Sequence, residues 1–234
     1  MNKFKRMFAF LLLAMGLVVA NVAEAVKIGD IYQGGIVFFV DNGGQHGLIA
    51  ARADQNGGAG IPWYNGTYFV TNATADGLYA GVSNTNLIIS TQTTVALLCS
   101  DKYWSSFCSQ YNSTTPAITG NYAALVAQEY SVQEDGQTAC TASSSSKKCY
   151  GDWYLPSKYE LNLMYSNIGP NVKTLKNKWG FAYDFYWSST EDCEDCYTES
   201  NPYNAWSQDF FNGYPSPTTK NLSLQIRVIR SFSI

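Results

Sequence analysis

The chain has 234 residues and a formal net charge of −3, with 14% charged and 15% aromatic side chains. A nucleic-acid-binding protein carries a clustered basic surface. This chain as a whole does not provide one, so its composition excludes nucleic acid as a partner. The 17 tyrosines and 6 tryptophans can fill a large core and still leave rings at the surface, where an apolar body with a polar tip suits binding.

The first 25 residues have the pattern of a secretory signal peptide. A basic start (residues 3–6) precedes an almost wholly apolar stretch (7–20) and an Ala-Glu-Ala cleavage site (23–25). We therefore expect one mature domain, residues 26–234, that is secreted, periplasmic or at the cell surface and does not span a membrane. Removing the signal from 15 basic and 18 acidic residues leaves 12 and 17, a net charge of −5.

Six cysteines in an exported chain favour disulfide bonds. Fifteen connectivities exist for six cysteines. Sequence spacing favours three local pairs, which are Cys99 with Cys108, Cys140 with Cys149, and Cys193 with Cys196. The middle pair brackets a serine run, and closing a flexible loop of this kind restricts the unfolded chain.

The mature chain opens with a predicted β-hairpin. Residues 36–40 are β-branched and aromatic, residues 41–45 have turn chemistry, and residues 47–51 return as the second strand. A Gly- and Asn-rich loop follows over residues 52–66. Trp63 is the expected anchor of that loop.

Two helices are predicted in the middle of the chain. Asn84 is a candidate N-cap for a helix that runs to about residue 100, with a rough 3.6-residue apolar period. Residues 122–130 form a stronger helical segment, and residues 137–148 a polar loop.

Residues 151–161 carry the clearest local signal. Pro156 favours an extended residue before it and lies just outside the next helix. Ser157 and Glu160 have the spacing of a capping box, in which each side chain bonds the backbone N–H of the other residue. A helix with one apolar face is expected to follow, and residues 171–179 are expected to add a helical turn or two.

The last third of the chain reads as strands. Residues 185–190, 204–211 and 224–230 are the predicted strands, with Asn212-Gly213 as a turn signal. Helices in the middle and strands at both ends predict an α+β fold with mixed or antiparallel sheets, two to three helices and long loops. The first and last strands are expected to pair.

Several stretches together resemble one known family. They are residues 29–38 (GDIYQGGIVF), residues 84–88 (NTNLI), residues 152–161 (DWYLPSKYEL), residues 186–191 (YWSSTE), Ala205-Trp206 and residues 227–232 (RVIRSF). With these motifs in this order, the chain resembles the Lcl C-terminal-domain family, named for a collagen-like bacterial adhesin.

The resemblance implies a C-type-lectin-like fold, related to that of the formylglycine-generating, sulfatase-modifying enzymes. It also implies a bacterial source, a homotrimer and binding of sulfated polysaccharides. Two features depart from the family. The chain has no collagen-like Gly-X-Y repeat, and it is acidic, whereas a sulfated polyanion calls for clustered Lys and Arg. The resemblance therefore bears on the fold more than on the ligand.

Catalytic residues are not expected. His46 is the only histidine and lies in the predicted hairpin turn. Cys193 and Cys196 form a single C-x-x-C whose acidic neighbours disfavour the thiolate, so a structural disulfide is preferred to a redox or zinc site. The sulfatase-modifying enzymes carry their active cysteines near the domain end, and residues 222–234 contain no cysteine.

No cofactor is expected, with Ca²⁺ as the one alternative. The candidate oxygen ligands are Asp192, Glu194, Asp195 and Glu199. The Glu-Pro-Asn and Trp-Asn-Asp patterns of calcium-dependent lectins are absent, so a solvated acidic loop is the preferred interpretation.

The predicted binding surface is the segment 203–220. Sugar recognition pairs an aromatic ring with the C–H face of the sugar, while amides and carboxylates bond its hydroxyl groups. The candidate residues are Tyr203, Asn204, Trp206, Asp209, Asn212, Tyr214 and Lys220. Strand alternation places Trp206 on either a binding face or a core face.

The closing strand has a structural candidate of its own. Arg227 and Arg230 fall on opposite faces of that strand. One of them is expected to pair with a buried acid such as Glu191.

Three functions are compatible with these features. The first is an exported, non-enzymatic recognition domain that binds glycans or surface proteins in adhesion. The second is a structural subunit of a secreted or surface assembly without a sugar site. The third and least favoured is an enzyme of the sulfatase-modifying kind.

Overall fold

The structure, a computed structural model, describes residues 25–99, 121–142, 147–192 and 202–234, without the side chains of residues 94–99. In chain order its elements are β1 (Ile31–Tyr32), β2 (Gly35–Val40), β3 (His46–Ala50), the 3-10 turn η1 (Gln55–Gly58), α1 (Ala80–Cys99), α3 (Ala123–Glu129), β4 (Val132–Gln133), β5 (Cys149–Tyr150), α4 (Lys158–Ile168), β6 (Phe185–Glu191), β7 (Asn204–Asp209), β8 (Pro215–Thr219) and β9 (Ile229–Ser233). Every sheet is antiparallel. The predicted α+β class is confirmed. No helix in the described ranges is long and apolar enough to cross a membrane.

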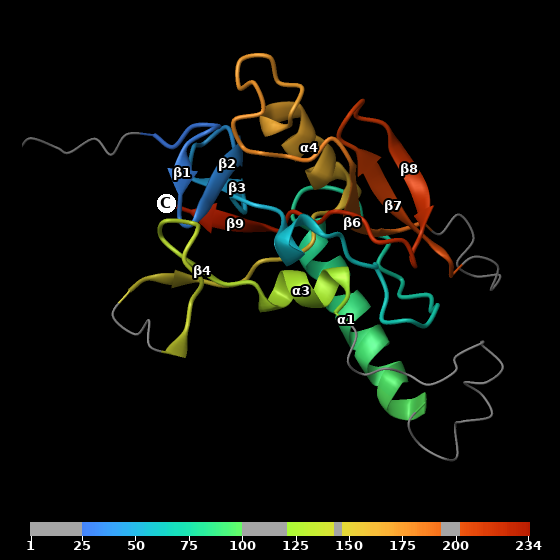
Figure 1. Cartoon of the computed structure of the whole chain (residues 1–234). Helices are drawn as coiled ribbons and strands as arrows, with labels where there is room; N and C mark the ends of the chain where they lie inside the picture. Colours follow the sequence, from blue (N-terminus) through green and yellow to red (C-terminus); the bar gives the residue numbers. More distant parts are fainter. Residues whose placement is uncertain (1–24, 100–120, 143–146, 193–201) are drawn as a thin grey trace, which may run out of the picture.

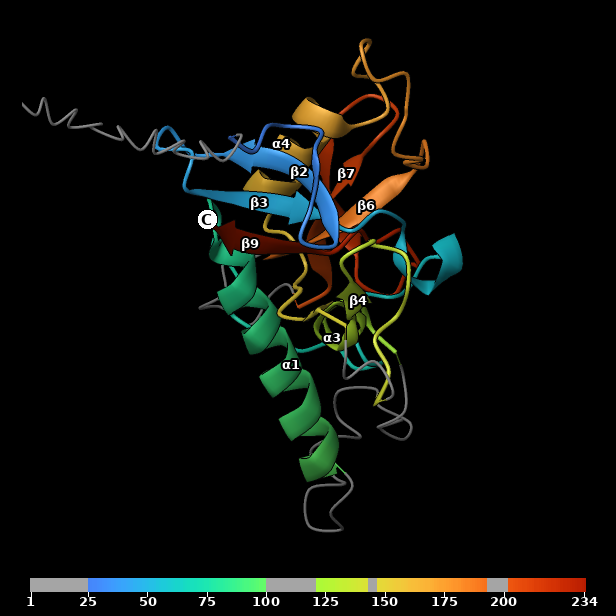
Figure 2. The same cartoon turned by 90° about the vertical axis from the view of Figure 1, so that its left-hand side faces the viewer.

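The first sheet has the spatial order β1-β2-β3-β9 (Figure 1). Its β2–β3 hairpin lies where the sequence predicted it, with Val37 opposite Ile49. The last strand joins this sheet, but its neighbour is β3 rather than β1. Figure 2 shows β2, β3 and β9 side by side, with α1 running away below them.

The closing strand begins five residues later than the alternation over 224–230 predicted. Leu224 instead exchanges backbone hydrogen bonds with Ile61, and the Val228 carbonyl accepts from the N–H of Ala51. Residues 225–229 are buried without alternation, because they contact several segments in turn, and a regular ladder forms only from Ile229.

Two hydrophobic cores lie on the two sides of the first sheet. One joins the sheet to α4, to the loop after α4 and to Tyr186 and Phe210 of the second sheet. The other joins it to α3 and to three tryptophans, Trp63, Trp153 and Trp187, each at most 2% exposed. The predicted anchoring role of Trp63 is confirmed.

Helix α4 begins as the capping box predicts. The Ser157 hydroxyl accepts from the N–H of Glu160 at 3.2 Å, and the Glu160 carboxylate accepts from the N–H of Ser157 at 2.8 Å. The helix lies between the two sheets in Figure 1. Residues 171–179 form turns rather than the extra helix that was expected.

Helix α1 starts at Ala80, four residues before the predicted cap. Asn84 is fully buried inside the helix, and its side chain bonds the backbone N–H and C=O of Ala75. The asparagine therefore satisfies backbone hydrogen-bonding groups of the loop before the helix, and the prediction that it caps the helix was wrong.

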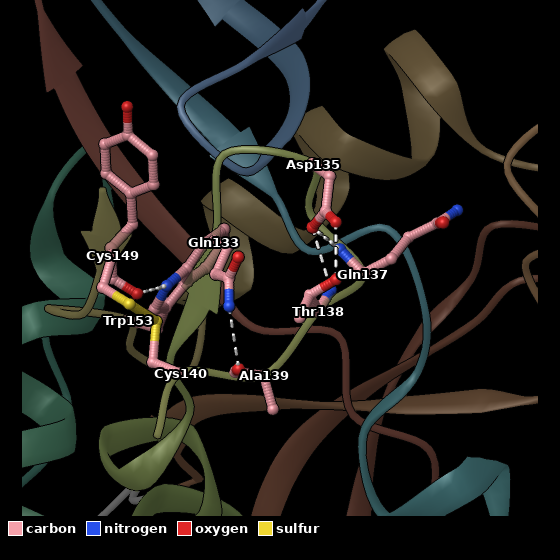
Figure 3. Close-up of a disulfide and its surroundings, with 9 residues drawn as sticks. Gln133, Asp135, Gln137, Thr138, Ala139, Cys140, Cys149 and Trp153 are labelled. Carbon is pink, nitrogen blue, oxygen red and sulfur yellow. Dashed lines mark hydrogen bonds between the residues drawn. A yellow bond between two sulfur atoms is a disulfide. The ribbon is translucent and has the colours of Figure 1, made fainter. Parts of the chain in front are cut away.

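The second sheet has the order β6-β7-β8. Beside α3, the short β4–β5 hairpin is closed by a disulfide between Cys140 and Cys149, as predicted (Figure 3). Cys108, Cys193 and Cys196 lie outside the described residues, and Cys99 ends α1 with its side chain undescribed.

Arg227 has the structural role expected of one of the two arginines. It is 1% exposed, and its Nε bonds Asp54 at 2.7 Å. Its partner is therefore Asp54, while the predicted partner Glu191 pairs with Lys220. Arg230 instead donates to the Gln33 side chain at 2.9 Å.

Candidate functional site

The turn between β7 and β8 presents the most exposed large aromatic side chains in the described part of the chain. Phe211 is 66% exposed and Tyr214 is 73% exposed. We call residues 209–214 the aromatic turn. The neighbouring Phe210 points the other way and is fully buried in the core beneath α4.

The backbone of the aromatic turn is fixed by its own polar side chains. The Asp209 carboxylate accepts from the N–H of Phe211 at 2.7 Å, and the Asn212 amide oxygen accepts from the N–H of Tyr214 at 2.9 Å. Gly213 has a positive φ of 85°, which glycine adopts at low cost. The turn therefore holds its two exposed rings without help from a ligand.

The aromatic turn is also tied to its surroundings. The Gln208 amide donates to the Gly213 carbonyl at 2.9 Å, and the Asn171 amide donates to the Phe211 carbonyl at 2.6 Å. Tyr183, which is 56% exposed, makes an edge contact with the Phe211 ring. Tyr183, Phe211 and Tyr214 thus place three exposed rings at this end of the second sheet.

Tyr203 lies at the opposite end of β7. Strand register places Tyr214 beside Asp209, so six residues at about 3.4 Å each separate Tyr203 from the aromatic turn by roughly 20 Å. Tyr203 instead packs edge-on against Tyr68, which packs against Tyr64. Burial and these neighbouring tyrosines raise the pKa of Tyr68 to about 12. The predicted segment therefore has two separate aromatic groups.

Trp206 lies between these ends and is half-buried. The Lys158 ammonium sits over its ring, 3.3 Å from the centroid, an arrangement in which the charge is attracted to the electron-rich face. The covered ring is less available than the rings of the aromatic turn. Asn204, the first residue of β7, is half-buried as well.

Lys220 cannot belong to an exposed surface, because its side chain is fully buried. It forms an ion pair with Glu191 and donates to the Phe69 carbonyl at 3.1 Å. Glu191 also accepts from the N–H and the hydroxyl of Thr71. Burial lowers the pKa of Lys220, and the adjacent Glu191 carboxylate opposes that effect. The pair joins the loop before α1 to the second sheet.

A cleft with a volume of about 850 Å³ lies where the segment after β3, the end of α3 and the loop after α4 meet. Tyr130 and Trp179 give it aromatic walls, and Arg52, Glu129 and Lys178 give it charge. Arg227 links two parts of the cleft lining, since its guanidinium donates to Asp54 and to the carbonyl of Trp179. No sequence pattern pointed to this cleft, because its residues come from four separate segments.

The described residues do not assemble a metal site. In residues 25–99, 121–142, 147–192 and 202–234, no group of three or more His, Cys, Asp or Glu side chains could hold an ion. Asp192 is buried, and Glu194, Asp195 and Glu199 lie outside these ranges.

Comparisons with known proteins find no family model that matches the chain and no curated protein that matches it.

The sequence missed Phe211 and Tyr183 as surface residues. In the pair Phe210-Phe211 one ring had to face the core, and the direction depends on where β7 ends. The Asn212-Gly213 turn signal marked that end. It was the one signal that could have placed Phe211 in an exposed turn.

Proposed function

We propose that this protein is an exported, non-enzymatic recognition domain that binds a glycan through the aromatic turn. One observation carries the proposal: Phe211 and Tyr214 are 66% and 73% exposed on a turn whose backbone is already fixed by hydrogen bonds. Exposed rings on a flexible turn could collapse onto the surface. On a fixed turn they remain available for the C–H face of a sugar.

Polar groups beside the rings suit the hydroxyls of a sugar. Asp209 and Asn212 each use one side-chain oxygen within the turn. The second carboxylate oxygen of Asp209 and the amide nitrogen of exposed Asn212 therefore remain for an acceptor and a donor role. Such a platform binds with little loss of conformational entropy, because it is ordered beforehand.

The proposal includes a C-type-lectin-like fold, membership of the Lcl C-terminal-domain family, and export of a single domain after signal removal. Support comes from a sheet that joins the N-terminal strands to the C-terminal strand, and from two structured motifs of the resemblance. Residues 152–161 supply the start of α4, and residues 186–191 lie in β6. By the same resemblance, the domain is proposed to be a homotrimer.

A glycan array probed with purified residues 26–234 tests the proposal, with and without Ca²⁺. The double variant F211A/Y214A is expected to lose about tenfold or more in affinity for any glycan that binds, since each ring contributes about a kcal/mol. Y159A is the matched control, because Tyr159 is 45% exposed on α4 and outside the site.

Two results would contradict this function. One is the absence of binding to any glycan on the array, which would favour the structural-subunit alternative. The other is binding that F211A/Y214A leaves unchanged, which would move the sugar site elsewhere on the molecule.

A further inference from the structure

The outer edge of β9 has backbone groups directed away from the first sheet. In the β3–β9 ladder, Ala51 bonds Val228 and Gln45 bonds Ile234. Antiparallel bonding alternates along a strand. In this register the backbone N–H and C=O groups of Arg230 and Phe232 face β3, and those of Ser231 and Ser233 face outward. Both serines are exposed.

A segment of the chain starts to cover this edge and then leaves it. Tyr154 exchanges two backbone hydrogen bonds with Ile229, at 2.8 and 3.0 Å. Two residues earlier, Asp152 has a φ of 59°, a left-handed conformation that turns the backbone. The chain therefore diverges where its next pairing partner would be Ser231. In the described ranges, Ser231 and Ser233 have no strand neighbour on this side.

Ser231 and Ser233 of the open edge line a groove with a volume of about 660 Å³. Leu78 and Tyr79, from the segment just before α1, also line it and are 37% and 40% exposed. The backbone of Tyr79 is anchored, since its N–H donates to the buried Glu160 carboxylate at 2.7 Å. Its φ of 64° is unusual for a residue with a side chain. Asp41 and His46 lie at the groove as well.

The outer edge of β8, in the second sheet, differs from the outer edge of β9. Hydrogen bonds from Asp209 to Tyr214 and from Lys220 to Tyr203 show which β8 residues face β7. By the same alternation, Pro215 and Pro217 face outward, and proline has no N–H to offer a further strand. Prolines at an edge are a common protection against strand addition. Edge β8 is blocked, whereas edge β9 keeps donors and acceptors at Ser231 and Ser233.

We propose that the β9 edge binds an extended peptide from another protein, which adds as a strand beside Ser231 and Ser233. The occupant follows from the spacing of the groups. N–H and C=O pairs that recur every second residue, about 7 Å apart, match the backbone of another extended chain. An alternate side chain of that peptide would face Leu78 and Tyr79, so an aromatic or large aliphatic residue fits there. This site is separate from the aromatic turn and does not depend on the glycan proposal.

The probe is a capped, fluorescein-labelled peptide of about eight residues that alternates threonine with phenylalanine. Fluorescence polarisation with the purified protein is expected to show saturable binding. Backbone amide spectra are expected to shift at Ser231 and Ser233. The same peptide with N-methylated central residues cannot form the ladder and is expected not to bind, which tests the mode of binding without any change to the protein.

Two variants of the protein complete the test. S231P removes the outward N–H, leaves the pairing with β3 intact and is expected to weaken binding at least tenfold. S231A keeps the N–H and is expected to stay within about twofold of the wild type. F211A/Y214A is expected to bind the peptide normally, so failure of the glycan site would not be mistaken for failure of this one.

Three outcomes would overturn the proposal. The amide signals of Ser231 and Ser233 could stay unshifted up to millimolar peptide, or the N-methylated peptide could bind as well as its parent. Finally, sedimentation could show a wild-type dimer that S231P dissociates, which would make a second copy of the chain the occupant.

Discussion

Glu160 is a buried carboxylate that serves the starts of two helices. Besides closing the capping box of α4 through the N–H of Ser157, it accepts from the N–H groups of Tyr79 and Gly81 at the start of α1. It also accepts from the Tyr154 hydroxyl at 3.1 Å. Burial raises the pKa of Glu160, and the hydrogen bonds from Ser157 and Tyr79 oppose that effect. One side chain thus fixes α1 relative to α4.

Replacing Glu160 with glutamine tests this role. All four partners of Glu160 are donors, and an amide has only one oxygen to accept from them. The amide nitrogen of E160Q would face two donors, so we expect a loss of about 3 kcal/mol in the free energy of unfolding. Urea denaturation at neutral pH measures it. E129Q, at an exposed glutamate of α3, is expected to change stability by less than about 0.5 kcal/mol; equal effects of the two variants would refute the dual cap.

Asp135 is an exposed acid with a low pKa. Hydrogen bonds from the Thr138 hydroxyl, then from the N–H groups of Thr138 and Gln137, lower its pKa to about 2 from an ordinary value of 3.8. Because the folded pKa is depressed, the stabilisation is complete above pH 3.8. It is lost as the pH falls through about 2.

A carboxyl titration followed by NMR checks this value. T138V removes the hydroxyl donor and is expected to move the pKa of Asp135 toward 3.8. T138S keeps a hydroxyl and should leave the pKa near 2. A wild-type pKa close to 3.8 would mean that the turn does not hold these hydrogen bonds in solution.

The β4–β5 hairpin depends on its disulfide more than on its strands. Each strand has two residues, and the Cys140–Cys149 bond closes a loop with a sequence separation of 9 (Figure 3). Loop-closure entropy predicts that C140A/C149A lowers the free energy of unfolding by about 2–3 kcal/mol. Urea denaturation of both proteins gives the difference. No change would show that the hairpin is held by its other contacts, such as the bond from the Gln133 N–H to the Thr138 carbonyl.

The elements that sequence predicts well are those whose signals are local. Helix α4 begins at its capping box because Ser157 and Glu160 bond each other, whatever surrounds them. Helix α1 was misplaced because the partner of Asn84 is Ala75, outside the helix. The closing strand was placed too early because Leu224 forms only an isolated bridge, with Ile61, and does not belong to a regular ladder. Alternation in the sequence does not show whether a segment joins a regular ladder or forms isolated bridges.

Two buried ion pairs connect distant parts of the molecule. Lys220–Glu191 fastens the loop that carries Phe69 and Thr71 to the second sheet, and Arg227–Asp54 fastens the end of the chain to the segment after β3. Attraction within such a pair roughly offsets the cost of removing both charges from water. The pairs therefore specify which segments meet more than they add stability.

Removing one member of a buried pair is expected to be costly. K220M leaves the Glu191 carboxylate buried without its cation, and we expect a loss of about 3–5 kcal/mol in the free energy of unfolding. K220M/E191Q restores neutrality and keeps an acceptor for Thr71, so it should be more stable than K220M. K173M, at an exposed lysine, is the control. Denaturation curves that rank the double variant below K220M would contradict this account.

The proposed binding surface could be predicted only in part, because it depends on how the strands and loops are arranged in the fold. The aromatic turn lies inside the predicted segment 203–220, and Tyr214, Asn212 and Asp209 belong to it. Lys220 turned inward because its partner Glu191 comes from β6, on the far side of β7, and the sequence does not show that arrangement. The sequence shows which polar side chains a segment contains. The arrangement of the sheet determines which of them are exposed.

The pairing of β3 with β9 also constrains the order in which the molecule is completed. Residues 46–50 have their strand partner in residues 229–233, at the end of the chain. Arg227, which forms an ion pair with Asp54, is synthesised only two residues before β9 begins. A ribosome must therefore release residues 229–233 before β3 acquires its second neighbour. Until then the hairpin has an open edge, and folding has to wait for a contact of very large sequence separation. A chain that stops before residue 229 would lack the strand that closes its first sheet.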